Sequence, residues 1–210
     1  MAQGGRTRTR VAQGFGFGGA DALGNAGEGG RRASDFAGQV ALVERVFREV
    51  EERGHRFLDE TVRRSTFNLR ATYARTANAL ARAGQTEKAI EVLNTATSKM
   101  PVSKLGYDYF SLGLIEGYYV AGDAESAKAM TEGFKTDIVQ RLEYFAQFKG
   151  KQARQVRSEV EANMQYLQML ARMNLQYTVG MALTQEAYQA DPMVQLYEKY
   201  AQQFGIQQQQ

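Results

Sequence analysis

The sequence lacks most of the residue types on which common catalytic and metal sites depend. Among its 210 residues there is no cysteine and one histidine, His55. Without cysteine there is no disulfide framework, no thiolate nucleophile and no cysteine-based zinc site. A single histidine also excludes metal sites built from several histidines. His55 lies in "ERGHRF", where a helix is expected to end, and we interpret it as a solvated or capping residue rather than a member of a catalytic triad.

Proline and long apolar runs are equally scarce. The only prolines are Pro101 and Pro192, and the chain is rich in Ala, Glu, Gln, Arg and Leu, which favour helix. A membrane-spanning helix needs about 20 mostly apolar residues, whereas the longest uncharged stretch, 173–185, carries Asn, Gln and Thr. The N-terminus has basic residues but no apolar core of signal-peptide length. We therefore expect a soluble chain with no direct membrane span.

The positive charge is concentrated at the N-terminus. The first 35 residues hold five arginines and three carboxylates, a net of +2 out of the chain's +3. The remaining body is left at about +1, which is no electrostatic footprint for DNA. We expect no nucleic-acid partner.

Composition divides the chain into three parts. Residues 1–34 hold ten of the 21 glycines and show no sustained apolar period. Such a segment cannot offset its ordering entropy, so we predict a disordered Gly/Arg-rich arm. Residues 35–205 are predicted to form one helical domain, and the low-complexity residues 206–210 a flexible glutamine tail.

Within the predicted domain, apolar residues recur every three or four positions and no segment alternates as a strand would. Glycines at 54, 84, 122 and 150 interrupt this pattern, and Asp123 and Asp191 precede helical stretches as caps. Helices are expected over about 36–53, Thr66–Ala83, Glu87–Met100, Tyr107–Ala121, 124–148, 153–177 and Pro192–Phe204. The fold class is therefore all-α.

The stretch "ARTANALARAGQTEKAIEVLNTATSKMP" (74–101) matches a tetratricopeptide unit, a helix–turn–helix module of about 34 residues with small residues at the crossing and proline at the exit. Counting back from Pro101 puts Gly84 at the turn between the helices. The remaining diagnostic positions hold Tyr73, Ala77, Leu80, Ala89, Leu93 and Ala96. Ala77 and Ala89 are expected to face each other at the crossing.

A second, weaker unit follows if Gly122 occupies the same turn. Tyr118 and Ala127 then fall at two diagnostic positions, and Phe134 at a third that usually takes alanine. The two glycines are 38 positions apart, so we place the extra residues in the connection 102–106. The helices after it do not fit the repeat and are interpreted as a long C-terminal cap, which solenoid ends require. The prediction is about two tetratricopeptide-like hairpins with this cap.

Residues 58–127 also resemble the C-terminal soluble region of a bacterial membrane family of uncharacterised function, related to protein O-mannosyltransferases. The resemblance is carried by "NLRATYARTANALARAGQTEKAIEVL", by the proline that ends that hairpin and by "YDYFSLGLIEGYYVAGD", with "FGFGGAD" (15–21) upstream. It implies a globular appendage on the extracytoplasmic, or periplasmic, side of a bacterial membrane. Glycines at 106 and 113 replace prolines expected in that family, and its spanning helices are absent, so no catalytic residue is carried over.

Recognition of a protein or peptide by a groove is the function we expect from such hairpins. The first helix of each unit would line the groove with Ala74, Asn78 and Ala81, flanked by Arg75 and Arg82, and then with Tyr109, Leu112, Glu116 and Tyr119. From these we select Asn78, Arg82, Tyr109, Glu116 and Tyr119 as partner-binding residues, since tyrosine gives large contact area at low entropy cost. The alternative is that the tyrosines pack against the neighbouring helix.

Other motifs have simpler interpretations. The carboxylate pairs 59–60 and 159/161 could act in acid–base chemistry but are typical of solvated helix faces. The glycine-rich stretches 14–19 and 27–30 follow no strand, so a phosphate loop is not expected. The basic stretch "FKGKQARQVR" (148–157) is interpreted as a solvated turn, with a patch for nucleic acid or lipid headgroups as the alternative.

Together these observations predict a non-enzymatic interaction or scaffold module with no catalytic, metal or cofactor site. It would be a subunit of a larger, membrane-associated bacterial assembly. The alternative is an accessory soluble domain of a mannosyltransferase-like membrane glycosyltransferase, which shapes acceptor access without performing chemistry.

Overall fold

The computed structural model describes residue 45 and residues 60–180 and 184–206. The predicted arm (1–34), the helix expected over 36–53, His55 and the tail beyond residue 206 lie outside this part of the chain. Every regular element within 60–180 and 184–206 is a helix, which confirms the all-α class. In chain order the helices are α2 (Glu60–Arg82), α3 (Thr86–Lys99), α4 (Val102–Leu105), α5 (Tyr109–Val120), α6 (Ala124–Phe145), α7 (Gly150–Gln155), α8 (Arg157–Thr178), α9 (Gln185–Ala190) and α10 (Pro192–Phe204).

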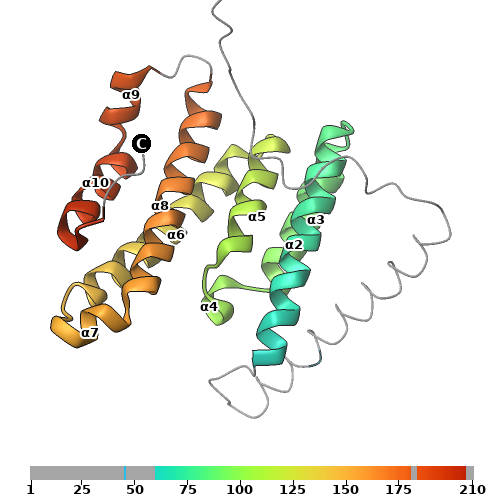
Figure 1. Ribbon diagram of the computed structural model, residues 1–210. Helices are drawn as coiled ribbons and strands as arrows, with labels where there is room; N and C mark the ends of the chain where they lie inside the picture. Colours follow the sequence, from blue (N-terminus) through green and yellow to red (C-terminus); the bar gives the residue numbers. More distant parts are fainter. Residues whose placement is uncertain (1–44, 46–59, 181–183, 207–210) are drawn as a thin grey trace, which may run out of the picture. The chain divides into compact units, whose positions relative to one another are not determined.

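The helices pack largely on their neighbours in the chain. Helix α2 contacts α3 and α5, α5 contacts α6, and α8 contacts α5, α6 and α10. Figure 1 shows this order, from α2 and α3 through α5 to α6 and α8, with α10 beyond α8. Two consecutive helix pairs, α2/α3 and α5/α6, are thus followed by α8, which contacts both helices of the second pair.

The two helix pairs turn in the same way. Gly84 (φ +78°) and Gly122 (φ +85°) both adopt the left-handed backbone conformation that favours glycine. In the first turn the backbone N–H of Gln85 donates to the carbonyl of Leu80 at 2.9 Å, and in the second Asp123 donates to Tyr118 at 2.9 Å. Both are the six-to-one bond of a Schellman motif, which satisfies a carbonyl left free at the helix end. The sequence placed both turns correctly.

The predicted helix ends are right where a capping side chain marks them. Asp191 accepts hydrogen bonds from the N–H groups of Met193 (2.8 Å) and Val194 (3.2 Å), and α10 spans the predicted residues. Asp123 caps α6 through the N–H of Ser126 at 3.0 Å. Elsewhere the predicted bounds need correction.

Five bounds differ from the prediction. Helix α2 begins at Glu60 rather than Thr66, α5 begins at Tyr109 rather than Tyr107, and α6 ends at Phe145 rather than Phe148. Gly150 opens the short helix α7 instead of separating two elements, and α8 begins at Arg157 rather than at residue 153. The short helices α4 and α9 were not predicted, because six residues or fewer give no readable period.

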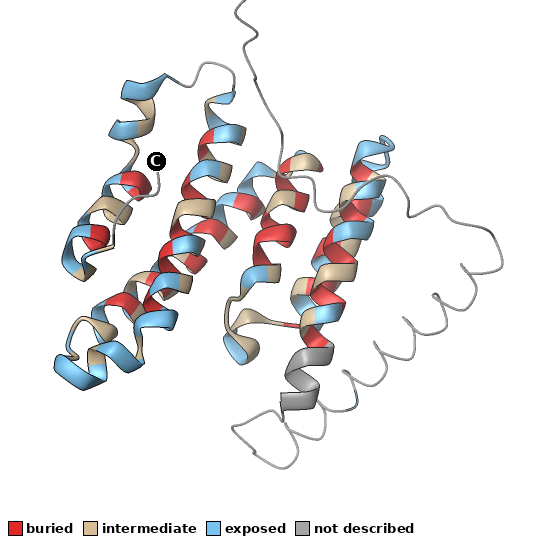
Figure 2. Ribbon diagram, viewed as in Figure 1, coloured by how far each residue is buried: buried red, intermediate tan, exposed pale blue. Residues whose placement is uncertain are grey.

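Most predicted repeat positions of the first helix pair are buried. The buried members are Tyr73, Ala77, Ala89, Leu93 and Ala96, while Leu80 is half-buried. In the second pair Tyr118, Ala127 and Phe134 are all buried. The apolar period of 153–177 predicts a stripe at Val156, Val160, Met164, Leu167 and Leu170. Helix α8 buries the last four, whereas Val156 precedes the helix and is half-buried. Figure 2 shows these buried residues where the helices face one another.

Helix α5 approaches α2 and α3 closely because it presents glycines to them. A Cβ atom on Gly113 would lie 3.1 Å from the Cβ of Ala74, and one on Gly117 would lie 2.9 Å from a methyl of Leu93. A larger residue at Gly113 would require α2 and α5 to shift by a few tenths of an ångström, and one at Gly117 would require the Leu93 side chain to move. The N-terminal half of the described chain is therefore packed on small residues.

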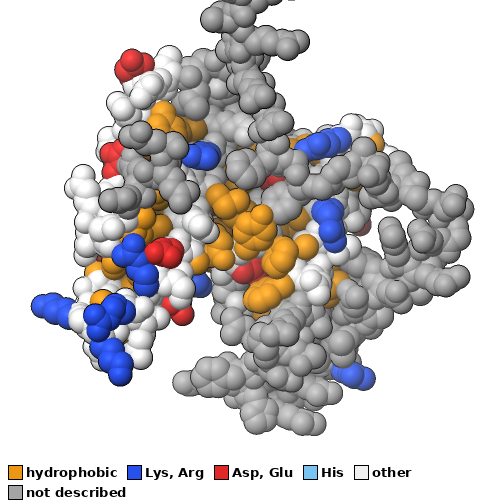
Figure 3. Space-filling view, viewed as in Figure 1, with side chains coloured by type: hydrophobic (Ala, Val, Ile, Leu, Met, Phe, Trp, Pro, Cys, Tyr) orange, Lys and Arg blue, Asp and Glu red, His pale blue; other side chains and the backbone are white. Residues whose placement is uncertain are grey.

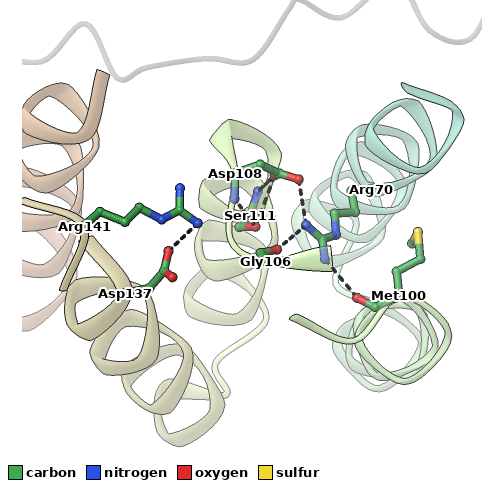
Figure 4. Close-up of polar contacts among 7 residues, drawn as sticks. All are labelled: Arg70, Met100, Gly106, Asp108, Ser111, Asp137 and Arg141. Carbon is green, nitrogen blue, oxygen red and sulfur yellow. Dashed lines mark hydrogen bonds and ion pairs between the residues drawn. The ribbon is translucent and has the colours of Figure 1, made fainter. Parts of the chain in front are cut away.

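A buried arginine fixes the connection between the two helix pairs (Figure 4). The guanidinium of Arg70, from α2, donates to the carbonyls of Met100 and Gly106, each at 3.0 Å, and to the carboxylate of Asp108 at 2.6 Å. Asp108 also caps α5 by accepting from the N–H of Ser111 at 2.9 Å. One fully buried cation thus holds the loop 100–108 and the start of α5 against α2.

Candidate interaction face

Five side chains from three helices meet at one place, which we call the interaction face: Arg82 of α2, Glu116 and Tyr119 of α5, and Asn174 and Tyr177 of α8. The rings of Tyr119 and Tyr177 stack with centroids 4.7 Å apart and planes 2° from parallel. The Tyr119 hydroxyl donates to the Asn174 side-chain oxygen at 3.1 Å. These contacts connect the end of α5 to the end of α8.

Glu116 lies at the centre of the face and is half-buried. Burial raises the pKa of Glu116, while the positive charge of Arg82 and a hydrogen bond from Tyr177 lower it, and the rise prevails. Burial likewise raises the pKa of Tyr177, helped by the negative charge of Glu116. A carboxylate, a guanidinium and a phenol therefore interact within a partly desolvated site, where each interaction is stronger than in bulk water.

The structure brings together three of the five predicted partner-binding residues. Arg82 is exposed, Glu116 is half-buried, and Tyr119 retains 9% exposure, with its ring packed on α8. The sequence left two possibilities for Tyr119: an exposed partner-binding residue, or a ring packed against a neighbouring helix. The structure shows the second, with the ring packed on α8. Its remaining accessible part borders Glu116, one helical turn away.

Tyr109 and Asn78 lie elsewhere. Tyr109 opens α5, so ten residues and about 15 Å of helix separate it from Tyr119. It is 40% exposed, with its ring edge-on to Phe110 at 5.6 Å. Asn78 is half-buried between α2 and α5, where its side-chain amide donates to the carbonyls of Ala74 at 2.9 Å and Gly113 at 3.5 Å. Asn78 therefore contributes to the helix contact.

The expected groove floor is corrected by the packing of α5. Ala74, Ala81 and Leu112 were predicted to line an open groove, but all three are buried. At Ala74 the cause is the close approach of Gly113, on which a Cβ atom would lie 3.1 Å from the Cβ of Ala74. Repeat spacing assigns these residues to the correct helices but does not show how closely a glycine-bearing helix packs.

Asn174 and Tyr177 were missed from sequence. Helix α8 was interpreted only through its apolar stripe, which faces α6 and α10. Tyr166, Asn174 and Tyr177 follow a second line beside that stripe, at steps of eight and three that keep them on one side of a helix. An offset polar and aromatic line of this kind is the signal that could have identified them.

A row of aromatic rings extends the connection between α8 and the second helix pair. Tyr107, before α5, stacks on Phe134 of α6 with centroids 4.8 Å apart, and Phe134 lies 5.7 Å from the ring of Tyr166 on α8. Burial raises the pKa of Tyr166, with a further contribution from the nearby carboxylate of Asp108. Figure 3 shows hydrophobic side chains gathered over the middle of the face on which α5 lies, with Lys and Arg around them.

The described residues contain neither a potential metal site nor a membrane-spanning helix. Within 60–180 and 184–206, no three His, Asp or Glu side chains come together as a potential metal site. In the same part of the chain, no helix combines the length and apolar character that membrane crossing requires.

Comparison of the chain with protein-family models, with curated proteins and with solved structures finds no match. The resemblance to a mannosyltransferase-related family therefore stays a prediction from the residues quoted above. Function has to be argued from the described geometry alone.

Proposed function

We propose that this chain is a non-enzymatic protein-interaction module of tetratricopeptide type. It would present the interaction face to a segment of a protein partner as a subunit of a larger assembly. The single observation that carries the proposal is the convergence of Arg82, Glu116 and Tyr177 from three different helices on one partly exposed site.

The tetratricopeptide assignment is supported by the equivalence of the two helix pairs. Both turn at a left-handed glycine with the same hydrogen bond, and the expected alanines Ala77, Ala89 and Ala127 are fully buried. In arrays of this kind the first helices of successive units share one side. Here α2 and α5 are those helices, and α8 takes the third place beside α5.

Glu116 gives the face a role beyond packing. Burial raises the pKa of the Glu116 carboxyl group although the charge of Arg82 and the hydrogen bond from Tyr177 lower it. The ionised carboxylate of Glu116 therefore destabilises the folded chain. An apolar residue at this position would avoid that cost. Groups whose pKa is perturbed by burial and a specific charge partner mark functional sites more often than other residues do.

The chemistry of the face fits a polypeptide segment. Glu116 accepts hydrogen bonds, Arg82 donates them, and the half-buried ring of Tyr177 offers apolar contact beside them. Tyrosine and arginine are the residues that dominate binding energy in protein interfaces. The exposed ring of Tyr109 would extend the contact along α5 toward its first turn.

The proposal is tested by selecting peptides from a random display library against the purified chain. Binding of a selected peptide should weaken by about 1–2 kcal/mol in Arg82→Ala, Glu116→Gln and Tyr109→Ala, roughly 5- to 30-fold in Kd. Glu125→Gln and Lys128→Ala, exposed on α6, are the matched controls and should bind like the unmodified chain. Equal losses in test and control variants would contradict the proposal. Binding of a lipid-linked sugar at the same residues would instead favour the accessory glycosyltransferase domain.

A further inference from the structure

The end of α6 and the short helix α7 form a second surface with its own composition. From Tyr144 to Ser158 the chain carries three aromatic residues, four cations and no carboxylate. Elsewhere in the described part acidic and basic residues are interspersed, which leaves the body near neutrality. This segment is therefore unusual in carrying only positive charge. It lies next to the start of α8, whereas the interaction face is near the end of α8.

The aromatic residues of this segment are accessible. Tyr144 is 57% exposed, the larger of the two values found for exposed large hydrophobic residues in the described chain. Its ring is edge-on to Phe148 with centroids 5.0 Å apart and lies 5.8 Å from Phe145. The three rings form a small cluster at the point where α6 ends, with Tyr144 outermost.

The cations beside this cluster are exposed and lack carboxylate partners. Lys149, Lys151 and Arg154 make no ion pair within the described residues. Arg157 differs, since it is paired with Glu161 at 2.6 Å and donates to the carbonyl of Phe204 at 2.9 Å. Figure 3 shows Lys and Arg side chains projecting around α7, at the lower left. We call Tyr144, Phe148, Lys149, Lys151 and Arg154 the aromatic–basic tip.

We propose that the aromatic–basic tip binds the surface of a membrane that contains anionic phospholipid. Aromatic side chains with a polar end locate at the headgroup level of a bilayer, and Lys and Arg beside them bind lipid phosphates. Charge complementarity selects the anionic surface, because the three exposed cations make no ion pair within the described residues. This site is independent of the interaction face and does not rest on the function proposed for it.

A membrane fits the tip better than a single-stranded nucleic acid does. Single-stranded nucleic acid stacks successive bases on several aromatic rings, but of the three rings here only that of Tyr144 is exposed. A backbone-tracking site also needs a charged groove several nucleotides long, whereas these cations occupy one short helix and its start. A compact tip with an outermost tyrosine is suited to a flat surface.

Fluorescence tests the aromatic part of the proposal, because the full chain has no tryptophan. A Tyr144→Trp variant would carry one tryptophan at the tip, and Tyr188→Trp one on α9, which follows the other end of α8. With phosphatidylcholine vesicles containing about 30% phosphatidylglycerol, emission of the Tyr144→Trp variant should shift to the blue and that of Tyr188→Trp should not. An equal shift in both variants, or none in the first, would overturn the proposal.

Sedimentation with the same vesicles tests the charges. The triple variant Lys149→Ala/Lys151→Ala/Arg154→Ala should lower the partition coefficient on the order of 100-fold, since each cation near an anionic surface contributes about a factor of five. The matched variant Lys88→Ala/Lys128→Ala/Arg172→Ala removes the same charge at exposed positions elsewhere. It should leave the partition coefficient unchanged. The arginines at the N-terminus are common to both variants.

Three results would overturn the lipid assignment. They are equal binding of the two triple variants, absence of binding by the unmodified chain, and preference for a 20-nucleotide single-stranded RNA over vesicles through the same three cations. Retention on pure phosphatidylcholine vesicles as strong as on the anionic ones would also contradict it, because the cations would then contribute nothing.

Discussion

The two halves of the described chain differ in the balance of small and large buried side chains. Around α2, α3 and the facing side of α5, the small residues Ala74, Ala77, Ala89, Gly113 and Gly117 lie beside larger buried ones such as Leu69 and Leu93, and a buried ion pair fixes the connecting segment. Around α6, α8 and α10, large residues predominate, among them Phe134, Leu142, Met164, Leu167 and Leu170. Small residues let helices approach closely and fix their register by shape, whereas large ones fill a wider space with apolar area.

This difference explains why the predicted repeat pattern is clearer in the first half than in the second. Small residues at fixed positions are a signature that few other arrangements need, but a stripe of leucine and phenylalanine suits any helix contact. The interaction face lies where the two halves meet, since Arg82 comes from the first and Tyr177 from the second.

Loss of the buried arginine should have the largest effect. Arg70→Ala leaves the Asp108 carboxylate and two carbonyls without their donor, which should lower the free energy of unfolding by about 3–5 kcal/mol. Urea denaturation measures the change. Arg141→Ala is the control, because its ion pair with Asp137 joins residues one turn apart whose side chains are 38% and 30% exposed, so about 1 kcal/mol or less is expected. Similar losses in both variants would mean that Arg70 is not the fixing residue.

In the second half, removing volume should be costly. Leu167 is fully buried on α8, and Leu167→Ala should lower the free energy of unfolding by about 2–5 kcal/mol through lost apolar contact and the cavity that remains. Thermal unfolding followed by circular dichroism tests this. A loss below about 1 kcal/mol would show that α8 does not pack as described.

In the first half, adding volume should be costly instead. Ala89→Leu inserts a larger side chain at a fully buried position and should lower stability by about 1–3 kcal/mol. Ala79→Leu, on the exposed side of α2, is the matched control and should be nearly neutral. An unchanged melting temperature for Ala89→Leu would contradict the repeat register, because the register places this residue at the helix crossing.

The smallest effect is expected from Glu116 and depends on pH. Since its pKa in the folded chain is above the ordinary value of 4.5, the folded chain holds the proton more tightly than the unfolded chain does. Stability from this group is therefore present below pH 4.5 and is lost as pH rises through the folded pKa. Relative to the unmodified chain, Glu116→Gln should gain about 1–3 °C in Tm between pH 4 and pH 7. A difference independent of pH would show that Glu116 is not desolvated.

Local signals decided how much of the fold could be predicted. Capping aspartates and left-handed glycines act within a few residues, so the turns at Gly84 and Gly122 and the helix from Pro192 were read correctly. The bond from Arg70 to Asp108 joins positions 38 apart, and no local pattern distinguishes Arg70 from other arginines of α2. Its burial follows only from the tertiary arrangement.

The candidate site was predicted in part for the same reason. Arg82, Glu116 and Tyr119 were selected from their places in the predicted repeat, whereas Asn174 and Tyr177 come from the part interpreted as a cap. The stack of Tyr119 on Tyr177 depends on how closely α8 approaches α5, and helix spacing is not encoded in periodicity. The same limitation placed Ala74 and Ala81 in a groove instead of in a helix contact.

The most direct test of the interaction face is photo-crosslinking in native cells. Ala83, exposed beside Arg82, would be replaced by p-benzoylphenylalanine, with Lys128→p-benzoylphenylalanine as the control on α6, and adducts identified by mass spectrometry. We expect one predominant protein adduct from position 83, no such adduct from position 128, and a weaker adduct when Glu116→Gln is combined with the first variant. The same adducts from both positions, or an adduct from position 83 that Glu116→Gln leaves unchanged, would contradict the proposed face.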